Sequence, residues 1–548
     1  MSIVKFIPGK SHKWINYNIN NLEMWIASDN GQYIANHISK NLNNLKAINQ
    51  NKLNNILYSI NKHFGLIVIG KNITFAAVDS CRSYPIYWAN TKNGFILSNQ
   101  AKVIAKVTNS KINKNQRIAF QMSGYTIGDS TLWSEIKNIN FGEYIIFKKN
   151  RIYEKYRYFL YNPWIKSNLK LNDLKVQLKN EINIILKKLV ETANGRTIAI
   201  PLSAGLDSRL IASGLKEIGY LNVKCFSYGL KNNFESKASK KIAKALGFKW
   251  KFVEFNNKII SNYFQSQHYR DCFDIINDGC AVPGIQDLYA IKKLLEDKFL
   301  LSNDLIVNGN SGDFISGGHI PHFAKKWDLQ FNKNVLNLIF NAHYVKHYAL
   351  WMHLLNKKNE KIIQRELNKQ IKSITIKNNK EILPQGILEL IEFENRQSKY
   401  VINFQRVYDF YKLSWALPLW DQSFINFWSS VPTEFKINQT LYKKVLYELN
   451  MGKVWTRDYE FKEKISPSWA RYLRFILKIF FVLLGKNKWH KFDKKYLSYW
   501  TDNLCGQSLL PYNEIIKNKN GARHFVSWHT LYAEEITLGK NWQNLEIK

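Results

Sequence analysis

Cysteine is scarce in this chain, which has five in 548 residues, at Cys81, Cys225, Cys272, Cys280 and Cys505. No two of them have the spacing of a metal-binding motif, so a cysteine-ligated metal centre is not expected. The first residues do not have the pattern of a secretory signal peptide. We therefore expect a reducing, cytoplasmic location.

Acidic residues are also few. There are 42 of them against 79 lysines and arginines, which gives a net charge of +37. Such an excess of positive charge is typical of proteins that bind nucleic acid or an anionic membrane. Here, however, the positive residues are mostly lysine, are spread along the whole chain and accompany many asparagines and isoleucines. Arginine clusters are lacking, so we expect no nucleic-acid partner.

Long apolar runs are rare as well. The most apolar stretch, Arg471 to Lys486, is too short and too charged to span a bilayer. Its basic flanks and aromatic residues suit a helix that lies on a membrane face, which would place the protein at the inner membrane surface. A buried helix in a large helical lobe would explain the same sequence, and the two interpretations are left open.

The length of the chain exceeds what one hydrophobic core usually serves and predicts two domains. We place the first at residues 1–168 and the second at 169–548. The boundary follows Pro163 and Trp164 and precedes a predicted amphipathic helix, whose apolar positions are Leu174, Leu178, Ile182, Ile185 and Leu189.

A phosphate-binding loop is predicted between residues 198 and 209, where a buried strand, a turn of small residues and a helix follow one another. The glycine spacing and Gly-Lys-Ser/Thr ending of the Walker loop are absent. The pattern instead resembles the PP-loop of enzymes that cleave ATP between its α and β phosphates. An ordinary strand-to-helix connection is the alternative. Candidate ATP contacts are Leu202, Ser203, Ala204, Gly205, Asp207 and Ser208, with Asp207 also a magnesium ligand.

Further strands alternate with helices, as a parallel sheet requires. The segment Val223–Gly229 and the segment Phe252–Phe255 flank a helix predicted at Ser236–Leu246, and Tyr228 and Gly229 fall at a strand end where ligands bind. Leu305–Val307 is followed by a glycine-rich loop, in which Gly309 is a nucleotide contact and Asp313 a second magnesium ligand. Asp313 would alternatively cap the next helix.

Four blocks of sequence, in order, resemble the asparagine synthetase family. The family's Ser-Gly-Gly-Leu-Asp-Ser reads Ser203–Ser208 here, and its Ser-Gly-Glu-Gly-Ser-Asp-Glu-x-Phe-Gly-Gly-Tyr reads Asn308–His319. Leu417–Asp421 is similar to Pro-Phe-Leu-Asp, and a lysine-bearing helix around Lys443 follows Val431 and Pro432. The resemblance implies a PP-loop ATP pyrophosphatase domain with a parallel sheet and a helical C-terminal lobe.

The first part of the chain fits the same family. Short strands predicted near residues 64–69, 73–79, 84–88 and 94–98 favour an antiparallel sheet, similar to the family's Ntn-hydrolase-like glutaminase domain. That domain uses a cysteine directly after the initiator methionine, and Ser2 stands there instead. We therefore expect a degenerate glutaminase domain that packs on the synthetase domain, with no catalytic role for Ser2.

The synthetase domain departs from the family at its acceptor pocket. Asn310 replaces a glutamate proposed to help proton transfer; an amide can orient a nucleophile but cannot act as a base at neutral pH. We assign Asn310 and Lys443 as candidate catalytic residues. Lys443 is preferred over Lys444, Lys462 and Lys464 because of its place in the helix that resembles the family's. Glu235 is expected to favour the helix dipole, and the histidines at 343, 347 and 353 are not expected to bind metal.

The resemblance implies an ATP-dependent ligase that adenylates a carboxylate, releases pyrophosphate, and transfers ammonia or an amine with loss of AMP. Because the acceptor pocket differs from that of the family, we do not expect aspartate to be the acid. We favour bacterial surface-polysaccharide or specialised-metabolite biosynthesis, and within these a sugar acid of a surface polysaccharide, because a surface helix at 471–486 would place the enzyme near lipid-linked intermediates. A lactam- or peptide-cyclising synthetase, an inactive nucleotide-binding scaffold and an RNA-adenylating enzyme are the alternatives. The acid, the nitrogen donor and a homodimeric state are left open.

Overall fold

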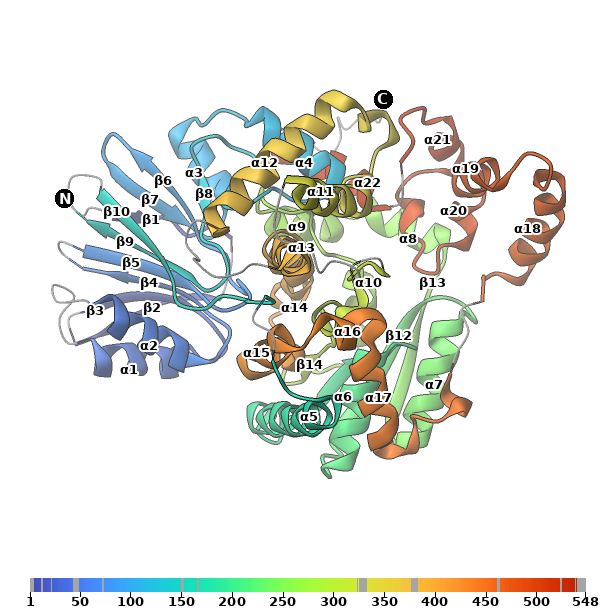
Figure 1. Ribbon diagram of the computed structural model, residues 1–548, viewed down its shortest axis with the longest axis horizontal. Helices are drawn as coiled ribbons and strands as arrows, with labels where there is room; N and C mark the ends of the chain where they lie inside the picture. The colour runs from blue at the N-terminus through green and yellow to red at the C-terminus, as the bar shows by residue number, and fades with distance from the viewer. Residues whose placement is uncertain are drawn as a thin grey trace.

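The computed structural model of this protein describes residues 4–10, 13–20, 22–42, 49–70, 73–148, 152–164, 167–322, 324, 333–375, 383–460, 464–522, 525–537 and 539. Figure 1 shows an N-terminal lobe of β-strands on the left, a parallel sheet lower in the molecule, and helices around and between them. This is the α/β fold class expected from the sequence.

The N-terminal lobe contains a six-stranded sheet in the order β10-β9-β5-β4-β3-β2, with every neighbouring pair antiparallel. One face is covered by the helices α1 (Gly31–Asn41) and α2 (Gln50–Ile60). Side chains alternate between the two faces, since Leu66 and Val68 pack toward these helices and Ile67 packs toward the opposite side. The strands are β2 (Trp14–Ile19), β3 (Leu22–Ala27), β4 (Gly65–Ile69), β5 (Ile73–Val78), β9 (Glu143–Lys148) and β10 (Ile152–Arg157).

A second sheet adds to the antiparallel layout that the sequence predicts. Its order is β1-β7-β6-β8, and the β1–β7 pair is parallel, which the spacing of short strands did not indicate. The inner faces of the two sheets contribute to one apolar core, including Ile67, Trp88 and Phe147. The strands are β1 (Val4–Phe6), β6 (Tyr87–Thr91), β7 (Gly94–Ser98) and β8 (Lys137–Asn138).

The parallel sheet has the order β13-β12-β11-β14-β15, and all its neighbours run in the same direction. Its central strands are apolar and buried, as expected for strands covered on both faces. Because β11 and β14 are neighbours, the loops that leave their carboxyl ends lie side by side. The strands are β11 (Ile198–Pro201), β12 (Val223–Leu230), β13 (Lys249–Phe255), β14 (Leu305–Val307) and β15 (Ser414–Ala416).

Helices make up most of the remaining described chain. Those nearest the parallel sheet in sequence are α5 (Leu171–Ala193), α6 (Leu206–Glu217), α7 (Phe234–Leu246), α8 (Asn257–Phe264), α9 (Gln267–Ile276) and α10 (Leu288–Glu296). Others are α3 (Ala101–Thr108), α4 (Lys114–Ser123), the π-helical turn η3 (Phe314–Gly318), α11 (Lys333–His347), α12 (Lys357–Thr375), α13 (Pro384–Glu392), the π-helix η6 (Phe393–Val401), α14 (Arg406–Phe410), α15 (Gln422–Ser430), α16 (Thr433–Lys436), α17 (Thr440–Leu449), α18 (Ser468–Phe481), α19 (Lys486–Tyr496), α20 (Ser498–Thr501), α21 (Tyr512–Lys517) and α22 (Phe525–Thr537).

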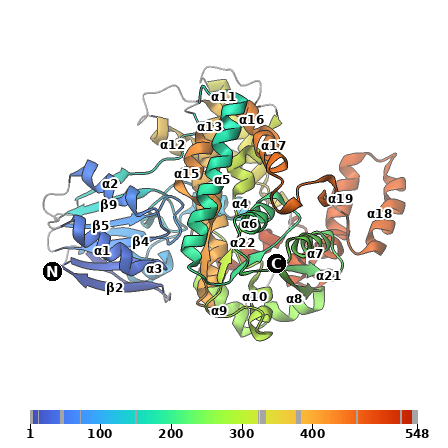
Figure 2. The same cartoon turned by 90° about the horizontal axis from the view of Figure 1, so that it is seen from below.

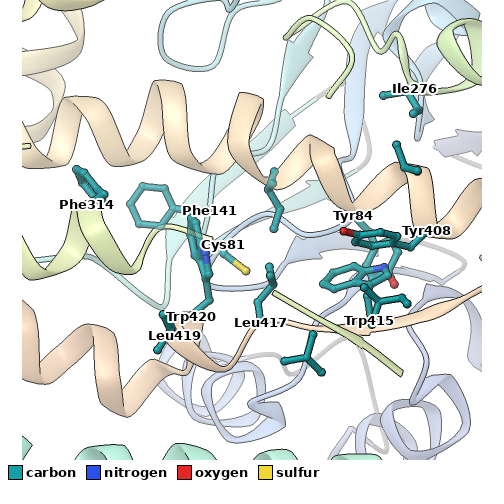
Figure 3. Close-up of a cluster of buried hydrophobic side chains, with 14 of the residues drawn as sticks. Cys81, Tyr84, Phe141, Ile276, Phe314, Tyr408, Trp415, Leu417, Leu419 and Trp420 are labelled. Carbon is teal, nitrogen blue, oxygen red and sulfur yellow. The ribbon is translucent and has the colours of Figure 1, made fainter. Parts of the chain in front are cut away.

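One apolar core continues from the β-lobe into the parallel-sheet region. The Phe141 and Phe393 rings lie 4.6 Å apart, and Tyr84 and Trp415 lie 5.8 Å apart. Figure 3 shows part of this core, with Cys81, Tyr84 and Phe141 from the β-lobe and Phe314, Tyr408, Trp415, Leu417, Leu419 and Trp420 from the later chain. The predicted boundary at 168/169 lies between β10 and α5 and stays a prediction.

None of the described helices has the length and apolar character needed to cross a bilayer. The segment 471–486 instead forms most of α18 and the turn after it. Together with α19 it lies at the edge of the molecule in Figures 1 and 2, away from both β-regions.

Candidate active site

The loop between β11 and α6 is held by its own hydroxyl groups. The backbone N–H of Ser203 donates to Ser208 Oγ at 3.1 Å, and that of Gly205 donates to Ser203 Oγ at 3.1 Å. The two hydroxyl oxygens are 3.1 Å apart. Gly205 is the N-cap of α6, so the positive end of this helix begins at the loop. The serines of the predicted phosphate loop therefore fix its shape.

Glu235 also shapes this loop. It lies in the first turn of α7, as expected, but Asn233 caps that helix by accepting from the backbone N–H of Ser236 at 2.8 Å. The Glu235 carboxylate accepts from the backbone N–H of Ala204 at 2.6 Å. Glu235 therefore ties the β12–α7 connection to the phosphate loop, a contact that no local sequence pattern indicated.

Asp207 and Asp313 come together although they are 106 residues apart. The backbone N–H of Asp313 donates to Asp207 Oδ2 at 2.9 Å, and both residues line one pocket. Tyr442 on α17 donates its hydroxyl to Asp207 Oδ1 at 3.0 Å. Asp313 also accepts from the N–H of Phe314 at 2.8 Å, so it caps η3 as the alternative interpretation held. The cap leaves Asp313 at the pocket wall.

Two glycines permit this approach. A Cβ atom at Gly309 would lie 2.6 Å from Asp207 Cβ, and one at Gly312 would lie 2.5 Å from Asp207 Cγ. Any larger residue would push the glycine-rich loop away from the first turn of α6. The glycines after β14 thus serve the contact between the two loops.

The two carboxylates have opposite pKa shifts. Burial, and then the charge of Asp313, raises the pKa of Asp207 to about 7. Burial would also raise the pKa of Asp313, but the hydrogen bond and charge of His319 lower it. Two acidic groups in one pocket favour a cation between them. Carboxylate oxygens are the ligands that Mg²⁺ prefers, so this pair fits the magnesium ion that the sequence predicts.

The pocket has a volume of about 470 Å³, which is within the usual range for small-molecule sites. Of the described residues that line it, Arg396 on η6 is the one with a positive charge. The walls come from both phosphate-side loops, β12, the residues just before α10, η6 and α14. The polar residues and glycines that line it are Ser203, Gly205, Asp207, Ser208, Tyr228, Gln286, Asp287, Asn308, Gly309, Asn310, Ser311, Asp313, Arg396, Gln397, Tyr400 and Tyr408. Amide and hydroxyl groups predominate among the side chains.

Asp287 adds a third carboxylate to this pocket. It is the N-cap residue of α10 and is buried, and Tyr408 donates its hydroxyl to Asp287 Oδ2 at 2.6 Å. The other oxygen, Oδ1, is buried without a hydrogen-bond partner in the described part of the chain. Burial raises the pKa of Asp287 to about 6, although the bond from Tyr408 opposes this.

A network behind Asp313 fixes its side chain. His319 Nε2 is 3.1 Å from Asp313 Oδ2, while His319 Nδ1 bonds to Glu392. Buried Glu392 also accepts from His347 at 3.1 Å and from Lys346 at 3.3 Å. Despite burial, interactions with His347 and His319 hold the pKa of Glu392 well below its usual value, and interactions with Asp313 and Glu392 raise the pKa of His319. His319 therefore orients Asp313 and is not itself part of the pocket lining.

The other predicted contacts have mixed positions. Tyr228 and Asn310 line the pocket, and the Asn310 carbonyl accepts from Trp420 Nε1 at 3.0 Å. Leu202 is buried beneath the loop. Gly229 has φ of +129°, and a Cβ there would lie 2.5 Å from the carbonyl oxygen of Asn503, so glycine is required for packing.

Lys443, Lys444 and Lys464 are not among the described residues that line the pocket. Lys443 is exposed and donates to the carbonyl of Asn438 at 2.9 Å. Lys444 and Lys464 are exposed as well. Lys462 and Ser2 lie outside the described residues.

Two histidines, His343 and His347, lie on α11. His347 contacts Glu392, and His343 is buried with neither ring nitrogen hydrogen-bonded to a described residue. Across the described ranges, the one group of three or more histidine, cysteine or acidic side chains with their ligand atoms close together is His63, Asp79 and Cys81. Asp79 there accepts three backbone N–H bonds, and burial raises the pKa of the Cys81 thiol well above its usual value. This group therefore shapes a turn.

One family model matches the part of the chain that forms the pocket. Residues 186–453 match the asparagine synthase family model. This segment contains both loops, Asp207, Asp287, Asp313 and Arg396. No curated protein matches the chain.

Many solved structures are similar to parts of it, and two of them illustrate the match. NH₃-dependent NAD synthetase from Campylobacter jejuni has 16% identity and a TM-score of 0.20, covering 39% of this chain and 99% of its own. Glutamine phosphoribosylpyrophosphate amidotransferase from B. subtilis has 10% identity and a TM-score of 0.19, covering 45% of this chain and 74% of its own. TM-scores this low do not support a shared function.

Proposed function

We propose that this protein is an ATP-dependent carbon–nitrogen ligase that adenylates a carboxylate and transfers ammonia or an amine to it. The observation that supports this most is the juxtaposition of Asp207 and Asp313, through the 2.9 Å bond, in a pocket beside the start of α6. The family match of residues 186–453 supports the same reaction class.

The charges of the pocket explain why ATP would need a divalent cation here. The pocket has three carboxylates and one arginine, and this excess of negative charge would repel a triphosphate. Asp207 and Asp313 would hold Mg²⁺, which neutralises charge on the phosphates and the leaving pyrophosphate. Ser203 and Ser208 offer hydroxyl donors on the same side, next to the positive end of α6.

Arg396 is the residue we assign to the acid. Its guanidinium can bind a carboxylate through two parallel hydrogen bonds, which would place the oxygen that attacks the α-phosphate. Gln286, Gln397 and Tyr400 line the same pocket with groups that both donate and accept hydrogen bonds. Such a lining suits a hydroxylated acid, and we therefore propose a sugar acid as the substrate class.

Asp287 is the residue we assign to the nitrogen donor. An ammonium or protonated amine cannot attack the acyl-adenylate until it loses a proton, and Asn310 cannot accept one. Asp287 Oδ1 has no partner in the described structure, and Tyr408 holds the other oxygen. Asp287 can accept the proton from nitrogen as the new C–N bond forms and AMP leaves.

Pyrophosphate exchange into ATP tests the first step. With a panel of sugar acids as the carboxylate, we expect acid-dependent exchange that Asp207→Asn lowers by about 100-fold or more, since several kcal/mol of charge stabilisation would be lost. Asp173→Asn, on the exposed first turn of α5, is the matched control and should keep full exchange. ATP binding without exchange for any acid would indicate a nucleotide-binding scaffold instead.

A further inference from the structure

The hairpin formed by α18 and α19 packs through only one side of α18. The Phe481 ring lies 5.5 Å from that of Trp489 and 4.9 Å from that of Phe492. Arg474 forms an ion pair with Asp493 on α19. These contacts define the inner face of α18, and among its residues Ala470 alone is fully buried.

The outer face of α18 is apolar and exposed. It comprises Tyr472, Phe475, Ile476, Ile479, Phe480 and Leu483. Their spacing of three or four residues places them along one side of the helix and its last turn. Phe475 is 69% exposed, Phe480 70% and Leu483 96%, and Val482 and Leu484 beside the tip are exposed too. Large apolar side chains gathered on one exposed face mark an interaction surface.

Positive charge surrounds this face. Residues 468–496 contain eight lysines and arginines and one acidic residue, Asp493, which is already paired with Arg474. The segment therefore has a net charge of +7 with histidine neutral. Arg471 and Lys478 are exposed along α18, and Lys486, Lys488 and Lys491 are exposed on α19 beside the tip.

We propose that the outer face of α18 docks on the surface of a membrane that contains anionic phospholipid. The apolar side chains would enter the boundary between headgroups and acyl chains, and the basic residues would contact lipid phosphates. The position of the hairpin at the edge of the molecule leaves this face open to a flat surface (Figures 1 and 2).

Charge selects this occupant over a second copy of the chain. If two hairpins paired through this face, two segments with a net charge of +7 each would repel one another. A negatively charged bilayer would instead attract each segment. Crossing the membrane is excluded for this helix by its 14 residues, which extend about 21 Å. The helix therefore lies in the membrane surface. This docking is separate from the ligase chemistry and does not depend on it.

A single fluorescent label provides the first test. All five native cysteines are buried, so Leu483→Cys on the full chain offers one accessible thiol for an environment-sensitive dye. We expect a blue-shifted, brighter emission with phosphatidylglycerol vesicles and little change with phosphatidylcholine vesicles. Val176→Cys, 58% exposed on α5, is the labelled control and should not respond. No response from Leu483→Cys with phosphatidylglycerol vesicles would overturn the proposal.

Vesicle co-sedimentation of unlabelled protein provides the second test. Phe475→Ser with Phe480→Ser should weaken partitioning into phosphatidylglycerol vesicles by about tenfold or more, because two phenylalanine side chains no longer leave water. Val176→Ser with Leu221→Ser removes comparably exposed apolar groups elsewhere and should not change it. Raising the salt concentration should weaken binding of the unaltered protein.

Light scattering without lipid separates the competing occupant. The unaltered protein and the phenylalanine double variant should have the same mass, and circular dichroism should show both folded. A doubled mass that the double variant loses would identify the face as a contact between copies and overturn the membrane assignment. Unchanged vesicle binding by the double variant would overturn it as well.

Discussion

Asp287 is the base in the proposed reaction, a role that Asn310 cannot fill. Asn310 lines the same pocket but has no basic group at neutral pH, whereas Asp287 has one oxygen held by Tyr408 and one without a described partner. Groups with perturbed pKa values in pockets are frequent in catalysis. The assignment separates two steps of the reaction, because only the second needs a base.

Asp287→Asn should lower the rate of nitrogen transfer by about 100-fold and leave acid-dependent pyrophosphate exchange within a few-fold, since general-base catalysis contributes at least that much. Single-turnover formation of the amide from preformed adenylate measures it. Asp297→Asn, at the other end of α10 and largely exposed, is the matched control. Equal losses in exchange and transfer would show that Asp287 only supports the pocket.

The pH profile gives the same assignment a second readout. A base with a pKa of about 6 is active when unprotonated, so the transfer rate should rise with pH through about 6 and then level off. The titratable and charged groups that surround it are Tyr408, Tyr228, Cys272 and Tyr411, with Arg396, Asp207 and Asp313 across the pocket. An acid limb retained unchanged in Asp287→Asn would refute the role.

Arg396→Gln should raise the KM for the acid by about 10- to 100-fold while the affinity for ATP stays nearly unchanged, since a charged hydrogen bond contributes about 1.5–3 kcal/mol. Initial-rate measurements at saturating ATP test this. Arg365→Gln, largely exposed on α12, is the control. A rise in the KM for ATP alone would assign Arg396 to the nucleotide.

The sequence indicated the loop residues of the pocket but not its walls. Ser203 to Ser208 and Asp313 belong to contiguous motifs that follow apolar strands, so local pattern was enough. Asp287 reads as an ordinary N-cap before an apolar helix, and Arg396 as a polar residue in a helix. Their role depends on long-range packing of α10 and η6 around the loops, which no local signal encodes.

At the scale of elements, the strands and helices with a strong apolar pattern were predicted from the sequence. The strands β11, β12 and β14 and the helices α5 and α7 are present where apolar runs and strand–helix alternation indicated them, and α17 is present where the family resemblance placed a helix. The three-residue strand β15 has too little pattern to be recognised alone and forms because β14 offers a free edge. The π-helix η6 likewise has no sequence signature that separates it from α13.

His343 on α11 should make the stability of the protein depend on pH. Burial, and then the nearby His347, hold its pKa well below the usual value, while Glu392 opposes this. Above pH 6.5 the ring is neutral in both the folded and the unfolded state. Below pH 6.5 the unfolded state takes up a proton that the folded state refuses, so stability falls by about 1.4 kcal/mol per pH unit.

The difference between His343→Leu and the unaltered protein isolates this effect. Thermal unfolding midpoints at pH 7 and pH 5 should show a smaller acid-induced drop in the variant. His490→Leu, exposed on α19, should behave like the unaltered protein. An identical drop in all three proteins would mean that the unfolded and folded states protonate His343 alike.

For the whole molecule, the contact between the β-lobe and the parallel-sheet region is a shared core that buried polar groups reinforce. Lys399 on η6 donates to the carbonyls of Thr126 at 2.8 Å and Gly128 at 2.6 Å. Glu394 accepts from Asn140 at 2.8 Å and lies 3.4 Å from Arg157. Because η6 also carries Arg396, the β-lobe supports a wall of the pocket whether or not it hydrolyses glutamine.

This coupling predicts that damage in the β-lobe spreads to the pocket. Phe141 is fully buried, with its ring 4.6 Å from both the Phe393 ring and the Arg157 guanidinium. Phe141→Ala should destabilise the protein by about 3–5 kcal/mol and lower the unfolding midpoint of both regions together, and ATP should protect the variant less. Phe475→Ala, the same substitution at a 69% exposed site, should leave the midpoint unchanged in lipid-free buffer. Differential scanning calorimetry with and without Mg-ATP measures each midpoint. Two separate transitions, of which Phe141→Ala shifts only one, would show that the β-lobe unfolds independently and that η6 keeps its position without it.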